Sequence, residues 1–243
     1  MSRLSDIQAQ TVVDGILAGY KNYLQERREK RSSMKVSYGY AFTKGNHIDD
    51  AVVNRLENMI EKTTLEKVKG GWEHFEYTFK NGVSCFFIIK NASRVRTATK
   101  KGSNESSYLI EYAALLNNNW IEEERLRDNQ QKEDDMVIQL SMLTEEEKKK
   151  LDERRQVREH DRFYLVIYET NELKMITRIE LVALDAVTRE LHQIQDLSPY
   201  IQTSDVEVTE AEASVVLGDS EIEFSEEYGY TVPAAKEEKN KSN

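Results

Sequence analysis

Residues 72–90, with the sequence WEHFEYTFKNGVSCFFIIK, decide the fold because they specify a β-hairpin. Two apolar runs flank Asn81-Gly82, and both of these residues tolerate the positive φ angles that a two-residue hairpin turn requires. Such a turn predicts that Lys80 pairs with Val83. Because side chains alternate between the two faces of a strand, this register predicts one apolar core face. Its members are Phe75, Tyr77, Phe79, Phe86 and Ile88.

The other face of this hairpin is mixed in character. It carries His74, Glu76 and Thr78 from the first strand and Cys85, Phe87 and Ile89 from the second. The second strand is therefore apolar on both faces, which is typical of a central strand that is covered on each side. In the predicted register His74 and Cys85 lie several residues apart, so we assign them no catalytic role.

A second hairpin is predicted over residues 163–183. The runs FYLVIYE and LKMITRIELVA are rich in β-branched and aromatic residues, and they flank a turn at residues 170–172. A two-residue loop would pair Glu169 with Lys174, which places opposite charges across the ladder. The two hairpins together predict one largely antiparallel sheet.

Helices are predicted to pack against this sheet. Three segments have apolar side chains at helical spacing, namely residues 6–30, 48–63 and 105–127. Ser5 precedes the first of them as an N-cap residue. We also expect a short strand over residues 35–43 and a short helix over residues 185–195. The predicted fold class is therefore α+β.

The acidic character of the chain is concentrated in its last part. The formal net charge is −10, and residues 203–243 hold eleven acidic residues but three basic ones. Apolar residues are sparse there, so we expect a disordered acidic tail after a single domain that spans residues 1–202. The alternative is an acidic interaction segment, or a mimic of nucleic acid, that becomes ordered on a partner.

Composition and cysteine usage favour a cytoplasmic protein that does not enter a membrane. Cys85 is the only cysteine, which excludes a disulfide within the chain and fits a reducing compartment. The chain begins without a hydrophobic signal region, and no apolar run approaches the ~18 residues that a membrane span needs. The sequence does not define the oligomeric state.

Two groups of basic residues are candidates for contact with an anion or a nucleic acid. The first lies in residues 91–104, NASRVRTATKKGSN, a predicted flexible loop without acidic residues that carries Arg94, Arg96, Lys100 and Lys101. The second lies at the end of the first predicted helix and consists of Arg27, Arg28 and Arg31. Basic side chains on such surfaces suit phosphate groups. The alternative interpretation of both groups is an ordinary solvated surface.

No motif in the sequence assigns a catalytic residue, a metal site or a cofactor. Glycine-rich nucleotide loops, the nucleophile elbow and zinc-ligand spacing are all absent. Arg155 and His160 resemble the Arg-x4-6-His pattern of the HEPN ribonucleases, but Gln156 departs from it and that family is all-helical. A strand ending in Lys90 resembles the core strand of the metal-dependent restriction-endonuclease fold, but Ile88 stands where that fold carries an acid.

A further resemblance extends over both hairpins. The residues that carry it are Gly71-Trp72, Phe75-Glu76, Asn81-Gly82, Ile88-Ile89-Lys90 and the run FYLVIYE. They resemble uncharacterised proteins of low-GC Gram-positive bacteria and their prophages, over residues 38 to 185. The resemblance implies an accessory role in regulation, defence or counter-defence.

The function we expect is that of a non-enzymatic binding or regulatory protein of phage or prophage type. It would act by contact with a protein partner, and it would contact nucleic acid through the basic loop. The alternative is a nuclease or another nucleic-acid-processing enzyme whose site carries no recognisable motif.

Overall fold

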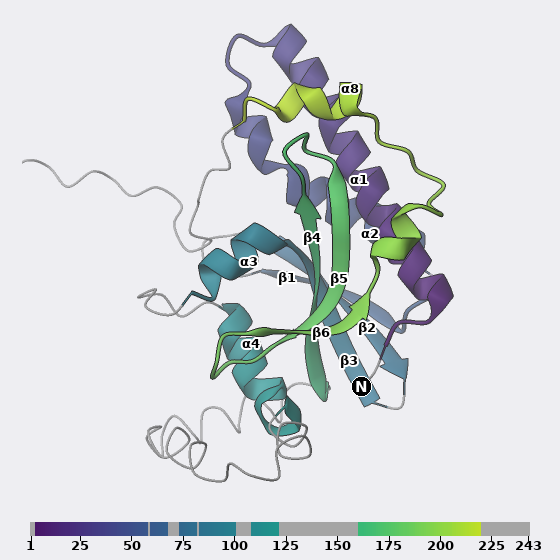
Figure 1. Cartoon of the computed structure of the whole chain (residues 1–243), viewed down its shortest axis with the longest axis vertical. Helices are drawn as coiled ribbons and strands as arrows, with labels where there is room; N and C mark the ends of the chain where they lie inside the picture. The colour runs from purple at the N-terminus through teal and green to yellow at the C-terminus, as the bar shows by residue number, and fades with distance from the viewer. Residues whose placement is uncertain are drawn as a thin grey trace, which may run out of the picture.

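The computed structural model has a six-stranded sheet with helices on both faces (Figure 1). It describes residues 3–57, 59–67, 73–81, 83–100, 108–121 and 160–219. The strands follow one another across the sheet in chain order, and all neighbours are antiparallel except the third and fourth. The predicted α+β class with a mainly antiparallel sheet is confirmed, and so are both predicted hairpins.

The described elements have the following bounds. The helices are α1 (Asp6–Ser33), α2 (Lys44–Leu56), α3 (Ala92–Ala98), α4 (Tyr108–Leu116) and α8 (Glu210–Ala213), with 3-10 helices η1 (Tyr38–Phe42), η2 (Ser198–Ile201) and η3 (Ser214–Val216). The strands are β1 (Lys62–Lys67), β2 (Glu73–Asn81), β3 (Val83–Asn91), β4 (Arg162–Thr170), β5 (Ile176–Leu184) and β6 (Leu191–Asp196).

The first hairpin, β2–β3, has a register one residue away from the predicted one. Asn81 pairs with Val83, and Phe79 pairs with Cys85. A shift of one residue exchanges the two faces of a strand, so Phe86 lies on the face opposite Phe79 rather than beside it. The pattern of β3 did not reveal this, because a strand that is apolar on both faces buries its side chains in either register.

Strand β3 is central and buried on both faces, as its sequence predicted. One core lies between the sheet and α1 with α2, and it contains Tyr77 and Phe87. The other lies between the sheet and α3 with α4, and it contains Phe86 and Ile88. Figure 1 shows these two pairs of helices on opposite sides of the strands.

Several local predictions are wrong. Residues 38–42 of the predicted strand at 35–43 form η1, and β6 replaces the helix predicted over residues 185–195. Helix α2 ends at Leu56, and the chain continues into the edge strand β1. In these places pairing with a neighbouring strand or packing on a helix overrides the local pattern.

The second hairpin also has its own register. Glu169 pairs with Arg178 rather than with Lys174, because the β4–β5 connection is longer than two residues. Lys174 has a positive φ of 61°, and its N–H donates to the Asn171 carbonyl in this connection. Opposite charges therefore still face each other across the ladder, although Glu169 forms an ion pair with Arg96 and Arg178 forms one with Glu180.

Helix α1 begins where predicted and packs closely on α2. Ser5 forms a capping box with Gln8, since each side chain accepts a hydrogen bond from the other residue's backbone N–H. A Cβ atom placed on Gly19 would lie 2.4 Å from the His47 carbonyl oxygen and 2.4 Å from the Ile48 Cα. The helices approach this closely because glycine occupies that position.

Gly19→Ala is therefore expected to destabilise the fold by about 2 kcal/mol, since the new methyl group pushes on the backbone of α2. The matched control is Gly45→Ala, where a Cβ would meet nothing within 4 Å. Alanine is a better helix former than glycine, so the control should leave stability unchanged or raise it by up to about 1 kcal/mol. Urea denaturation measures both variants, and equal effects would contradict this account of the helix contact.

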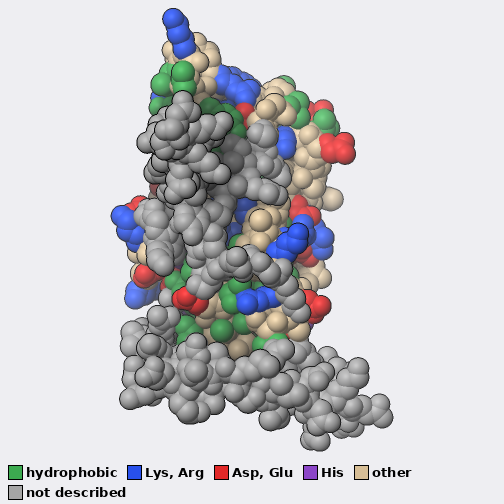
Figure 2. All heavy atoms as spheres, turned by 90° about the vertical axis from the view of Figure 1, so that its left-hand side faces the viewer, with side chains coloured by type: hydrophobic (Ala, Val, Ile, Leu, Met, Phe, Trp, Pro, Cys, Tyr) green, Lys and Arg blue, Asp and Glu red, His purple; other side chains and the backbone are tan. Residues whose placement is uncertain are grey.

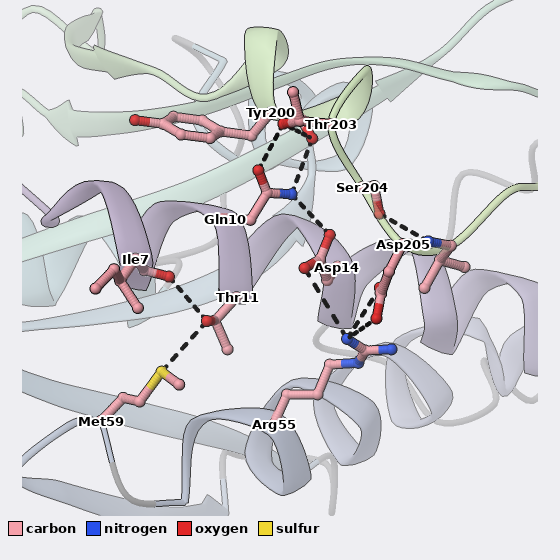
Figure 3. A network of polar contacts seen from close by, with 11 residues as sticks. Ile7, Gln10, Thr11, Asp14, Arg55, Met59, Tyr200, Thr203, Ser204 and Asp205 are labelled. Atoms are coloured by element: carbon pink, nitrogen blue, oxygen red, sulfur yellow. Dashed lines mark hydrogen bonds and ion pairs between the residues drawn. The ribbon is translucent and has the colours of Figure 1, made fainter.

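Residues 203–219 pack on α1 and α2, which differs from the tail expected there. Figure 3 shows Gln10 and Asp14 of α1 pointing toward residues 200–205, and Arg55 of α2 lying between Asp14 and Asp205. Several apolar side chains of this segment join the first core: Val206, Val208, Ala213, Val215 and Val216. These spaced valines are sufficient to anchor an acidic segment. Residues 220–243 lie outside the described residues.

Candidate functional site

The carboxyl ends of β3 and β4 lie side by side at the same end of the sheet, because these two strands are parallel. Asn91 at the end of β3 pairs with Tyr168 near the end of β4. In open sheets that contain parallel strands, ligands commonly bind outside the carboxyl ends of these strands. The carboxyl ends of β3 and β4 are therefore a candidate ligand site.

Three cations lie around these strand ends, and each comes from a different element. Lys44 opens α2, and its Nζ lies 5.8 Å from the centre of the Tyr168 ring. Lys90 is close to the end of β3, and its Nζ lies 5.9 Å from the centre of the Tyr108 ring. Arg94 lies in the first turn of α3, where the Asn91 side chain accepts hydrogen bonds from two backbone N–H groups.

Two of these cations influence the pKa values of the neighbouring groups Tyr168 and Asp49. Burial raises the pKa of the Tyr168 hydroxyl, and the nearby Arg94 guanidinium partly opposes that rise. Burial also raises the pKa of the Asp49 carboxyl to about 7, and Lys90 and a hydrogen bond from Tyr77 partly oppose it. We call Lys44, Asp49, Lys90, Arg94 and Tyr168 the sheet-end cluster.

Asp49 has the properties of a proton-exchanging group. The Tyr77 hydroxyl lies 3.2 Å from Asp49 Oδ1 and 3.1 Å from the Asp49 backbone carbonyl oxygen. A carboxyl group whose pKa is near neutrality, within the electrostatic influence of a lysine, is a common feature of functional sites.

A second polar group lies under α4. His74 is buried, its ring stacks on Tyr108 with 5.3 Å between ring centres, and its Nε2 lies 3.9 Å from Glu76 Oε1. The Lys90 ammonium group also lies over the Tyr108 ring, so this polar group adjoins the sheet-end cluster. Cys85 belongs to the core on the opposite face of the sheet, which keeps it apart from His74.

The first predicted basic group lies partly in this region. Arg94 and Arg96 lie on the helix α3 rather than on a flexible loop, and Arg96 forms an ion pair with Glu169. Lys100 is exposed just beyond α3, and Lys101 lies outside the described residues. Figure 2 looks from the side of the molecule that carries α3 and shows Lys and Arg side chains spread over that face.

The second predicted basic group, at the end of α1, is in contact with acidic and backbone groups of the same chain. Arg27 is buried, with 1% of its side chain exposed, and it forms an ion pair with Asp219 at 3.0 Å. Arg31 pairs with the same carboxylate, and Arg28 donates to the Ala211 carbonyl oxygen at 3.4 Å. The structure therefore does not bring the two predicted groups into one site.

Sequence reasoning missed Lys44 and Asp49 and treated Lys90 only as the end of a strand. The signal for Lys90 was its charge at the end of an otherwise apolar run in β3. Lys44 and Asp49 carry no such signal, because they join the site only through the packing of α2 on the sheet.

Other catalytic hypotheses gain little support. Ile88, at the position of the nuclease acid, is fully buried in the core under α3 and α4. His160 Nδ1 lies 3.1 Å from Ser84 Oγ, while Arg155 falls outside the described residues. Within the part of the chain that the structure describes, no three His, Cys, Asp or Glu residues are grouped to hold a metal ion, and no helix is long and apolar enough to cross a membrane.

In comparisons with known protein families, curated proteins and solved structures, nothing matches this chain.

Proposed function

We propose that the protein is a non-enzymatic binding protein that contacts the phosphate backbone of a nucleic acid through the sheet-end cluster. The observation that carries this proposal is the placement of Lys44, Lys90 and Arg94, which come from three elements and lie around one strand end. A bound anion relieves the mutual repulsion of such cations, and releasing counterions from the nucleic acid favours binding.

The wider role is the one that the resemblance implies. We propose a regulatory, defence or counter-defence protein of phage or prophage type that acts in the cytoplasm together with a protein partner. Cys85, the single cysteine of the chain, is a buried thiol, which supports a reducing compartment. Strand β1 lies at the edge of the sheet with Leu65 55% exposed, which supports contact with a partner there.

Arg94→Gln and Lys44→Gln test the site directly. Each variant is expected to weaken binding of a fluorescent oligonucleotide about three- to tenfold and to reduce the slope of log affinity against log salt by about 1. Fluorescence anisotropy over a range of salt concentrations measures both quantities, with single-stranded and duplex probes.

The matched control is Lys62→Gln, which removes one charge from the edge strand β1. It should change affinity less than twofold. Equal losses from Lys62→Gln and Arg94→Gln would contradict the proposed site and indicate attraction by charge alone.

The second candidate is a nucleic-acid-processing enzyme, and the neutral-range pKa of Asp49 beside Lys90 favours it. In that case the carboxyl group would accept or deliver a proton during cleavage. Gel assays with labelled DNA and RNA, with and without divalent cations, separate the two candidates. Cleavage by the natural sequence that Asp49→Asn abolishes would replace the binding proposal with the enzymatic one.

A further inference from the structure

The last turns of α1 form a two-arginine receptor for a carboxylate. Arg27 Nη2 lies 3.2 and 3.0 Å from the two carboxylate oxygens of Asp219, and Arg27 Nη1 donates to the Ser37 carbonyl oxygen at 2.8 Å. Arg31 approaches the same carboxylate from the adjacent turn. The planar fork of arginine matches both carboxylate and phosphate geometry, and the carboxyl end of a helix favours cations.

Arg27 is unusual for a surface ion pair because its side chain is almost completely buried. Its Nε is also buried and has no hydrogen-bond partner. The Nη2 atom of Arg27 meets both oxygens of the Asp219 carboxylate, and the same charge-assisted geometry suits the oxygens of a phosphate.

The segment that delivers Asp219 follows the basic face of α1. Lys21 donates to the Glu207 carbonyl oxygen at 2.7 Å and lies 3.5 Å from Glu212, and Arg55 pairs with Asp205 at 3.2 Å. Residues 205–219 carry five acidic residues and no basic one. The segment therefore contacts α1 with the charge pattern of a polyanion.

The end of this segment is held by ion pairs rather than by apolar burial. Val216 is buried in the core, but Leu217 is 48% exposed, and beyond it Asp219 supplies the ion pairs. Release of residues 217–219 would remove the carboxylate from Arg27 and Arg31 while Val206 to Val216 stay in place. Such a local release costs less than global unfolding when a phosphate replaces the carboxylate on the two arginines.

We propose that the Arg27–Arg31 site is a second nucleic-acid contact, which takes a backbone phosphate when Asp219 leaves and which residues 205–219 occupy in cis as a competitor. The inference rests on the proposed function for the class of ligand, but it uses a different surface. The acidic segment then sets the affinity of the protein for nucleic acid.

Asp219→Asn in the full chain tests this competition. The substitution keeps the shape of the side chain but removes its charge, so oligonucleotide binding should become about three- to tenfold tighter and its salt slope steeper by about 1 to 2. Asp205→Asn is the control, because it removes the same charge from the same segment but leaves Arg27 and Arg31 paired with Asp219. It should change affinity less than twofold.

The double variant Asp219→Asn with Arg31→Gln identifies the surface that gains binding. The gain should disappear in this variant, while a gain that persists, or no gain in Asp219→Asn itself, would overturn the inference. Adding Arg94→Gln to Asp219→Asn separates the two sites. Arg94→Gln should lower the affinity for the oligonucleotide, but Asp219→Asn should still raise that affinity by the same factor. Thermal unfolding of each variant verifies that the protein is folded at the assay temperature.

Discussion

Asn117→Asp should destabilise the protein by about 4 kcal/mol, the largest effect that we expect from a change of so few atoms. The Asn117 side chain is fully buried. Its Nδ2 donates to the carbonyl oxygens of Phe163 at 2.9 Å and Leu184 at 3.1 Å. Its Oδ1 accepts from the Phe163 backbone N–H and from Trp120 Nε1, each at 3.1 Å. All four hydrogen-bonding positions of the amide are therefore used.

Aspartate cannot reproduce this pattern. It would place a carboxylate oxygen against two carbonyl oxygens in a buried site, or it would bind a proton and donate only one hydrogen bond. The loss should therefore be smaller at low pH, where the buried carboxyl group is neutral. Urea denaturation at two pH values measures the effect.

Asn119→Asp is the matched control for this change. Asn119 lies two residues further along and is exposed, so the same substitution there should alter stability by less than about 0.5 kcal/mol. A loss below about 1 kcal/mol in Asn117→Asp would show that the amide network is not an important link between α4 and strands β4 and β5.

The example of Asn117 shows how far the sequence alone reaches. A helix was predicted over residues 105–127, and within this range α4 ends at Leu116. The sequence did not distinguish Asn117 from its two neighbours, because its partners Phe163 and Leu184 come from distant strands. Local signals such as the Ser5 cap and the Asn81-Gly82 turn were sufficient to locate elements. These local signals did not predict which side chains of different elements contact one another.

The same limit applies to the candidate site. Arg94 was identified because its segment is basic along the chain, but Lys44 and Asp49 join it only when α2 packs on the sheet. The acidic residues and sparse apolar residues of the segment 203–219 suggested a disordered tail, while its spaced valines and the arginines of α1 hold this segment in place. A sum of weak apolar contacts and ion pairs from another helix is not visible in the local composition.

Asp49→Asn should stabilise the protein at pH 8 by about 2 to 4 kcal/mol, even though it changes a residue of the candidate site. Burial raises the pKa of Asp49 in the folded protein to about 7, above the value of 3.8 for an exposed aspartate. The folded state therefore binds a proton more tightly than the unfolded state. Stability consequently falls as the pH rises from about 4 to about 7, and the full cost of the buried charge is present at pH 8.

Asparagine removes this cost because it is neutral at every pH and its Oδ1 still accepts the hydrogen bond from Tyr77. The variant should match the natural protein at pH 4 and exceed it increasingly as the pH rises. Asp50→Asn is the control, since Asp50 is the exposed neighbour. A stability difference that is constant with pH would show that Asp49 is not the titrating group. A gain at pH 8 together with weakened function would instead indicate that the charge is retained for function at the expense of stability.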